Sequence, residues 1–228
     1  MGTNTYDERL GAAEVAEWQR IGRVRRYADG DRLLSEGEPA REALLLAAGR
    51  VKVVSSSADG QDVVLAYRRP GEVFGEIAAL DGGPHSATVY AIGDVLAWSL
   101  TADQFLHFLE RQPRVAITLL LVMSRRLRQA DGQRLNYRAR SVLERMAERL
   151  LSLAEQCGED AGGGRRRVAI RVTMPELGAS VAAGRESAVK AFARLREMGA
   201  ISVDPGRRFV IEDPELLASV AAGRARES

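Results

Sequence analysis

The segment from Thr173 to Ile201 constrains the fold of this chain more than any other stretch of its sequence. It predicts two short helices joined by a tight turn of small residues at 182–184. Thr173 and Glu176 form a T-x-x-E capping box, which sets the start of the first helix. Apolar residues at helical spacing predict a buried face on the second helix. These residues are Ala188, Ala191, Phe192 and Leu195. The segment therefore indicates a helix-turn-helix, with an ordinary αα-hairpin as the alternative.

Three charged residues at the start of the second helix lie off its apolar face. They are Arg185, Glu186 and Lys190. A recognition helix presents its N-terminal residues to base edges in the major groove. There, an arginine can bind guanine O6 and N7, and a glutamate can accept a hydrogen bond from cytosine N4. The charged start of this helix therefore predicts contact with specific base pairs of double-stranded DNA.

The next segment predicts a β-hairpin and a last helix. Residues 200–203 and 208–211 are expected to form two short strands, and the D-P-G sequence between them is a strong turn signal. A hairpin that follows a helix-turn-helix is a wing. We expect Arg207 and Arg208 at its tip to contact DNA phosphates. Asp213 and the proline after it predict the start of a helix that runs through residue 222.

Short strand-like runs punctuated by glycine fill residues 20–100. The runs are 23–27, 32–34, 43–48, 50–55, 62–67, 87–91 and 95–100. Strands this short, with turns this frequent, predict a jelly roll or barrel. Thr101 and Gln104 form a second capping box, which opens a helix through Leu109. Together with the helices of the C-terminal region, this predicts an α+β protein.

A long helix is expected from Pro113 to Arg138. Its apolar residues recur in steps of 4, 3, 4 and 3 residues, which is the 3.5-residue repeat of a coiled-coil seam. The seam consists of Ala116, Leu120, Met123, Leu127 and Ala130. A helix of this kind favours a dimer interface over a buried core helix. We therefore expect three parts: a β-roll sensor domain over 1–112, a dimerisation helix over 113–138 and a winged helix-turn-helix domain over 139–228.

Two further elements are expected after the long helix. A helix over 141–156 has apolar residues at helical spacing. The sequence C-G-E-D-A-G-G-G-R-R-R that follows it predicts a glycine-rich loop before a strand at 168–172.

Composition excludes several classes of protein. The net charge is only +2, so binding to nucleic acid depends on a local basic face. The single cysteine, Cys157, excludes an internal disulfide and a cysteine-ligated iron–sulfur cluster within one chain. With two histidines and none of the common catalytic motifs, an enzyme is not expected. No signal peptide or membrane-spanning run is evident, so we expect a cytoplasmic protein without membrane contact.

The stretch from Pro70 to Ala91 contains the cassette F-G-E-I-A-A-L, in which residues 75–80 predict a tight turn into one short helix. Together with the glycine-punctuated barrel, the M-S-R-R-L of the long helix and the L-G…G-R-E-S of the winged helix, this cassette resembles the CRP/FNR superfamily of bacterial transcription regulators. That superfamily includes the cyclic-AMP receptor protein and the fumarate–nitrate reductase regulator. The resemblance covers nearly the whole chain. It implies a cyclic-nucleotide-binding-type β-roll, a long dimerisation helix and a winged helix-turn-helix.

The resemblance also implies a ligand pocket in the roll. In the family the cassette binds the ribose and cyclic phosphate of a nucleotide, and the matching residues here are Gly75, Glu76, Ile77, Ala78, Ser86 and Ala87. Glu76 corresponds to the ligand of the ribose hydroxyl. Ser86 and the backbone amides of Ala78 and Ala87 correspond to ligands of the phosphate.

Three positions depart from the family pattern. The family arginine that binds the phosphate is His85 here, and a histidine is mostly neutral at pH 7 unless its pKa is shifted. Two positions that contact adenine through hydroxyl groups in the cyclic-AMP receptor protein correspond to Ala130 and Asp131. Three alternatives stay open: a pocket that binds no nucleotide, a pocket for cyclic AMP, and a pocket for another ligand. The missing arginine favours the first over the second. His85 as a metal or haem ligand is the least supported, because the one other histidine is His107.

On the DNA side, the resemblance implies base contacts for Arg185, Glu186 and Lys190. Thr173 and Ser187 match positions that contact the DNA backbone. Lys190 stands where the cyclic-AMP receptor protein has an arginine. The family half-site resembles TGTGA, so a related GTG core is expected here.

The expected function is therefore a dimeric, sequence-specific transcription regulator. Two recognition helices would enter successive major grooves of a palindromic operator, about 34 Å apart. RNA polymerase is a further partner implied by the family, in which the loop corresponding to 157–164 can contact it. The alternative is a nucleotide-sensing module whose C-terminal domain binds a protein partner rather than DNA.

Overall fold

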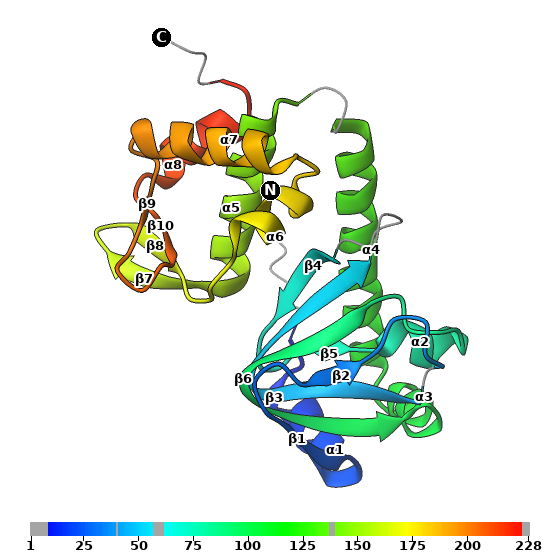
Figure 1. Cartoon of the computed structure of the whole chain (residues 1–228). Coiled ribbons are helices and arrows are strands. Elements are labelled where there is room, and N and C mark those ends of the chain that lie inside the picture. The colour runs from blue at the N-terminus through cyan, green and yellow to red at the C-terminus, as the bar shows by residue number, and fades with distance from the viewer. Residues whose placement is uncertain (1–8, 40, 57–61, 137–139, 225–228) are drawn as a thin grey trace. The chain divides into compact units, whose positions relative to one another are not determined.

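A computed structural model describes residues 9–39, 41–56, 62–136 and 140–224. The chain divides into two compact units, one of Met1–Ser55 with Ala66–Arg134 and one of Ser56–Leu65 with Leu135–Ser228 (Figure 1). Each unit has its own β-sheet.

The first unit is built on a six-stranded sheet. Its strands are β1 (Arg23–Tyr27), β2 (Arg32–Leu34), β3 (Glu42–Ser56), β4 (Asp62–Arg68), β5 (Val73–Phe74) and β6 (Thr88–Thr101). The main order is β1-β6-β3-β4, with β2 paired to β6 and β5 paired to β3. Strand β6 runs antiparallel to β1, β2 and β3. The predicted β-roll is confirmed.

Two strands are longer than the sequence predicts. The expected runs 43–48 and 50–55 are one strand, β3, and the runs 87–91 and 95–100 are one strand, β6. The pairing of β3 with β6 shifts its register on both sides of Ala48. At Gly49 an added Cβ would lie 2.4 Å from the carbonyl oxygen of Asp94. Gly49 therefore permits a close approach within a bulged strand and does not end it.

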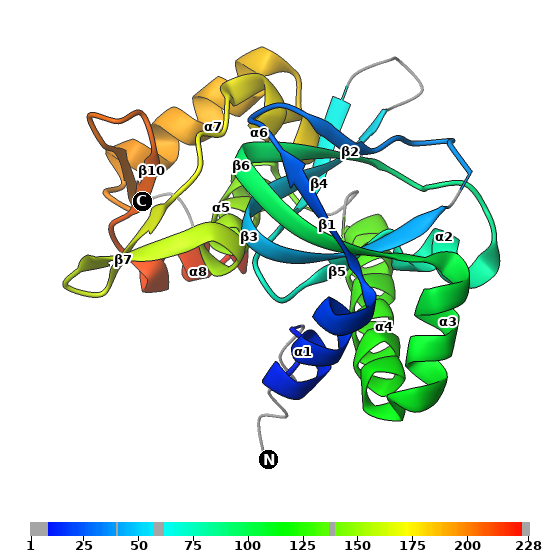
Figure 2. The ribbon, with the colours of Figure 1, turned by 90° about the horizontal axis from the view of Figure 1, so that it is seen from below.

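Four of the described helices belong to the first unit: α1 (Ala12–Ile21), α2 (Glu76–Asp81), α3 (Ala102–Arg111) and α4 (Pro113–Asn136). The capping box of Thr101 and Gln104 is present at the start of α3, as predicted. Helix α3 lies beside the first turns of α4 (Figure 2). Helix α1, which carries the fully buried Trp18, is not predicted from the sequence.

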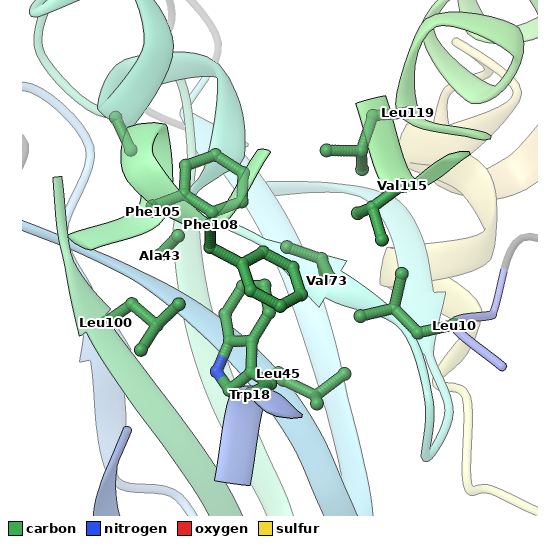
Figure 3. Close-up of a cluster of buried hydrophobic side chains, with 11 residues drawn as sticks. Leu10, Trp18, Ala43, Leu45, Val73, Leu100, Phe105, Phe108, Val115 and Leu119 are labelled. Atoms are coloured by element: carbon green, nitrogen blue, oxygen red, sulfur yellow. The ribbon is translucent and has the colours of Figure 1, made fainter. Parts of the chain in front are cut away.

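Trp18 lies at the centre of an apolar cluster that joins α1, α3 and α4 to the sheet (Figure 3). Its ring centroid is 5.6 Å from that of Phe105 and 5.2 Å from that of Phe108. The indole Nε1–H donates a hydrogen bond of 3.0 Å to the carbonyl oxygen of Trp98. The aromatic cluster therefore attaches the helices to the roll and satisfies the one polar atom of the indole.

Helix α4 has two apolar faces. One face is buried within the first unit and consists of Val115, Leu119 and Val122. The other face is open to solvent, with Ile117 54% exposed, Leu120 63% and Leu127 64%. Leu120 and Leu127 belong to the predicted 3.5-residue seam. These two leucines of the seam are therefore largely uncovered within this chain, whereas Ala116 and Met123 are partly buried.

The second unit contains the C-terminal helices and a four-stranded sheet with the order β7-β8-β10-β9. Its elements are α5 (Val142–Cys157), β7 (Gly158–Gly162), β8 (Arg165–Val168), α6 (Met174–Ser180), α7 (Arg185–Glu197), β9 (Ile201–Val203), β10 (Phe209–Ile211) and α8 (Pro214–Ala221). The hairpin of β9 and β10 was predicted. The loop predicted after Cys157 is wrong, because Gly158–Gly162 pairs antiparallel with Arg165–Val168. The strand predicted at 168–172 ends instead at Val168. No helix in the described part of the chain is long and apolar enough to cross a membrane.

Candidate DNA-binding face and ligand pocket

The helix-turn-helix begins at a capping box and depends on one close contact. The backbone N–H of Glu176 donates to Oγ1 of Thr173 at 3.3 Å, and the backbone N–H of Thr173 donates to Oε2 of Glu176 at 2.8 Å. Further along α6, an added Cβ on Gly178 would lie 3.2 Å from Cβ of Ala188 in α7. A side chain at that position would push the two helices apart. The sequence T-M-P-E-L-G therefore sets both the start of α6 and its distance from α7.

Helix α7 has the two faces that its sequence predicts. Its apolar face is buried, and it consists of Ala188, Ala191, Phe192 and Leu195. Its first turns present an exposed polar face, formed by Arg185, Glu186, Ser187 and Lys190. Nζ of Lys190 lies 2.6 Å from Oε1 of Glu186. The two side chains are 74% and 82% exposed, so this ion pair contributes little to stability.

The two arginines at the predicted wing tip differ in their surroundings. The backbone N–H of Arg208 donates to Oδ1 of Asp204 at 2.9 Å, and its Nε donates to Oδ2 at 3.1 Å. The hydrogen bond from the Arg208 backbone lowers the pKa of Asp204. Arg207 is exposed and has a positive φ of 60°. The turn therefore fixes Arg208 against Asp204 and leaves Arg207 on the surface.

A hollow in the roll brings together all the pocket residues that the sequence analysis placed in the roll. These are Gly75, Glu76, Ile77, Ala78, His85, Ser86 and Ala87. The other lining residues are Leu34, Val53, Arg68, Phe74 and Val89. The hollow holds about 440 Å³ of space outside the atoms, part of it open to solvent. The side chains of Ala130 and Asp131 lie outside the described part of the structure, so their place relative to the hollow stays a prediction.

Gly75 allows the hollow to form. Its φ is +76°, in the left-handed region that disfavours side chains. An added Cβ would lie 2.9 Å from Cδ1 of Leu34 and 3.1 Å from the carbonyl oxygen of Glu42. The next residue, Glu76, starts α2 and is only 4% exposed. The turn thus directs a buried carboxylate to a hollow that a larger residue would distort.

His85 is buried at 7% exposure and is fixed through its backbone. Its N–H donates to the carbonyl of Glu38 at 2.9 Å, and its carbonyl accepts from the N–H of Gly37 at 2.9 Å. Burial lowers the pKa of His85, although the carboxylates of Glu38 and Glu42 act in the opposite direction. The lowered pKa favours the neutral imidazole at pH 7, so His85 supplies no permanent charge. No cluster of three residues that could hold a metal ion occurs among the described residues.

Arg68 is a pocket residue that was not predicted from the sequence. Arg68 ends β4 and lines the same hollow as Glu76 and His85. No local motif marks it, because its place in the hollow depends on how β4 joins the sheet. The place of Arg68 in the hollow becomes apparent only when the order of the strands in the sheet is known.

Comparisons with known proteins agree with this architecture. The cyclic nucleotide-binding domain family model matches residues 24–112, and the Crp-like helix-turn-helix domain model matches residues 144–220. A CRP-like cAMP-activated global transcriptional regulator from Mycobacterium tuberculosis is 32% identical over 84% of this chain and 85% of its own length. The chain belongs to the CRP/FNR family.

Two other family members extend the comparison. The cyclic AMP receptor protein of Thermus thermophilus is 30% identical over 88% of this chain and 89% of its own length. The crystal structure of a CRP-family transcriptional regulator from the same organism matches with a TM-score of 0.69 and 27% identity. That match covers 90% of this chain and all of the other chain. The CRP/FNR chain described here is accordingly a DNA-binding transcription regulator, and its family is one of regulators rather than enzymes.

Proposed function

We propose that this CRP/FNR protein binds a palindromic operator as a homodimer and reads its sequence with α7. The observation that carries the proposal is the exposed polar face at the start of α7, formed by Arg185, Glu186, Ser187 and Lys190. The apolar face of the same helix is buried, so the helix backbone that carries these side chains is held in place. Base-specific contacts require this combination of a rigid helix and a polar N-terminal end.

Arg185 and Glu186 would contact base edges, with Lys190 at the outer base pairs. Thr173 and Ser187 would contact the DNA backbone, and the exposed Arg207 at the wing would add a phosphate contact. Arg208 would contribute to phosphate binding from its position beside Asp204.

Binding to a palindrome with two GTG-containing half-sites tests this proposal. Fluorescence anisotropy of the labelled palindrome and of a scrambled duplex, at several salt concentrations, gives the specificity ratio and the salt slope. We expect Arg185→Ala to lower the affinity for the palindrome by about 1–3 kcal/mol and to leave scrambled DNA little affected. If the wild-type protein binds both duplexes equally, or neither, the alternative of a protein-binding C-terminal domain is favoured.

The exposed apolar face of α4 supports the dimer. Ile117, Leu120 and Leu127 are each more than half exposed on a helix whose opposite face is already buried. A second copy of the helix, packed along the 3.5-residue repeat, would remove these side chains from water. Sedimentation velocity tests this directly. We expect a dimer for the wild type and a monomer for Leu120→Glu, with Leu65→Glu as a control, because Leu65 is 51% exposed but lies on β4.

The remaining parts follow from this arrangement. We propose a sensor domain over 1–112, a dimerisation helix over 113–138 and a DNA-binding domain over 139–228. The β7–β8 hairpin would be the surface for RNA polymerase, because it includes most of the segment 157–164 that corresponds to a polymerase-contacting loop of the family. The hollow in the roll would take a cyclic-nucleotide-type ligand with a partly altered set of contacts, and the cytoplasm is the compartment where all of these partners occur.

A further inference from the structure

The hollow still has a cation among its lining residues, although His85 stands where the family has its phosphate-binding arginine. Among its twelve lining residues, all of them described, three are ionisable: Arg68, Glu76 and His85. Glu76 is a buried carboxylate, and burial favours the neutral form of His85. Without Arg68, a phosphate in the hollow would face the negative charge of Glu76 and no positively charged lining residue.

Arg68 shares a carboxylate with a second arginine. Its Nε lies 3.7 Å from Oε2 of Glu72, and its Nη1 donates to the carbonyl oxygen of Tyr67 at 3.2 Å. Nε of Arg69 lies 3.4 Å from Oε1 of the same Glu72. If Arg68 turned towards a ligand, Glu72 would keep Arg69 as its partner. The move would therefore not leave the buried carboxylate of Glu72 without a cation.

Burial increases the effect of the charge on Arg68. The side chain of Arg68 is 12% exposed and that of Glu72 is 6% exposed, whereas that of Arg69 is 46% exposed. A charge removed from water interacts more strongly with a nearby anion than a charge at the surface. An arginine can also bind two oxygens of one phosphate at once. Arg68 therefore combines position, charge and geometry suited to a phosphate.

We propose that Arg68, from β4, supplies the phosphate-binding cation of the hollow in place of the arginine that the family carries at position 85. The ligand class is a cyclic mononucleotide: Arg68 binds its phosphate, and the carboxylate of Glu76 accepts hydrogen bonds from its hydroxyl groups. This inference rests on the proposed function, because it takes the hollow to be the ligand site of the regulator.

A matched pair of variants tests the inference. Arg68→Gln and Arg69→Gln each remove one partner of Glu72, but Arg69 does not line the hollow. The full-length protein is titrated with cyclic AMP and with cyclic GMP by calorimetry at pH 8, where His85 is neutral. We expect the wild type to bind at least one of the two. Arg68→Gln should weaken that binding by roughly tenfold or more, Arg69→Gln by less than about threefold, and Arg68→Lys by an intermediate amount. Circular dichroism melting shows whether each variant is folded.

Three results would overturn the inference. The first is no heat with either nucleotide for the wild type. The second is an equal loss in Arg68→Gln and Arg69→Gln, which would mean that the arginines act only through Glu72. The third is wild-type binding that is much tighter at pH 6 than at pH 8 and loses this difference in His85→Gln, which would assign the cation to His85 beside Glu38, Glu42 and Glu76.

Operator binding by the same samples separates this inference from the proposed function. If the wild type binds the palindrome specifically but binds no cyclic nucleotide, the Arg68 assignment fails and the regulator stands. If it binds a nucleotide through Arg68 but binds DNA without preference, the proposed DNA recognition fails and the Arg68 assignment stands.

Discussion

The recognition helix and the ligand hollow use charged residues in opposite ways. On α7 the charged side chains are exposed, lie within six residues of sequence and contribute little to folding. In the hollow the ionisable side chains come from β4, α2 and the segment before β6, and each is largely buried. The difference teaches that a surface for DNA can change its specificity one residue at a time, whereas a buried site must keep its charges balanced. A cation lost at one buried position can be replaced from another element.

The strongest test of this comparison substitutes one glycine from each site, Gly75 in the hollow and Gly184 at the start of α7. Gly75 has a positive φ and two contacts that a Cβ would disturb, whereas a Cβ on Gly184, the N-cap of α7, would meet no atom within 4 Å. We expect Gly75→Ala to destabilise the protein by about 2–4 kcal/mol through backbone strain and overlap. Gly184→Ala is the matched control and should cost only about 1 kcal/mol, because alanine is a poorer N-cap than glycine. Urea titration followed by circular dichroism measures both, and equal effects at the two positions would contradict the comparison.

Lys190 tests whether an exposed charge on α7 acts only on DNA. We expect Lys190→Ala to change the free energy of unfolding by less than about 0.5 kcal/mol, because its ion pair with Glu186 is exposed. Its affinity for the palindrome should fall by about 1–3 kcal/mol, with the loss confined to particular outer base pairs. The exposed Arg196 near the other end of α7 gives a control of equal charge change. A uniform loss across all sequences, with a salt slope smaller by about 1, would assign Lys190 to a phosphate instead.

His85 should make the stability of the protein depend on pH. Burial lowers its pKa in the folded state, so the unfolded chain binds a proton more readily than the folded protein. The contribution of His85 is present above its unfolded pKa of about 6.5 and is lost as the pH falls below that value. The loss is at most about 1.4 kcal/mol for each pH unit. We expect the melting temperature to fall less between pH 7.5 and pH 5.5 in His85→Gln than in the wild type. Identical pH dependence in the two proteins would show that the histidine is not desolvated.

The smallest expected effect is a gain at the start of α7. The N-cap residue Gly184 provides no side-chain hydrogen bond to the helix. Serine at this position can accept a hydrogen bond from a backbone N–H of the first turn, which is worth a few tenths of a kcal/mol relative to glycine. Gly184→Ser should therefore raise the melting temperature of the DNA-binding domain by about 1–2 °C. Differential scanning calorimetry measures this shift, and a lower melting temperature would mean that the N-cap conformation does not suit serine.

Local sequence signals predicted the elements of this fold well. The capping boxes at Thr101 and Thr173 gave the correct starts of α3 and α6, and helical spacing gave the correct buried face of α7. These signals succeed because each depends on residues within one or two turns of chain. The F-G-E cassette likewise identified the turn at Gly75 and the short helix after it.

The features that the sequence did not reveal depend on distant partners. Gly49 resembles a strand end, and only its approach to Asp94 shows that the strand continues. Gly158–Gly162 resembles a loop, but it pairs with the arginine-rich strand β8. Arg68 carries no motif, and its role in the hollow depends on the sheet that brings β4 to the cassette. Helix α1 was missed because its apolar stripe is weak and its main contribution is the single side chain of Trp18.

The positions of the tryptophans allow the two units of this regulator to be followed by different optical signals. The chain has two tryptophans, Trp18 and Trp98, and both belong to the unit that contains the roll. Tryptophan emission excited near the red edge of absorption therefore reports the roll alone, while far-ultraviolet circular dichroism reports both units. Melting the protein with both probes would show whether the roll and the winged helix unfold together or in sequence. Energy transfer from the two indoles to a fluorescent nucleotide analogue would likewise detect ligand in the hollow without a signal from the DNA-binding domain.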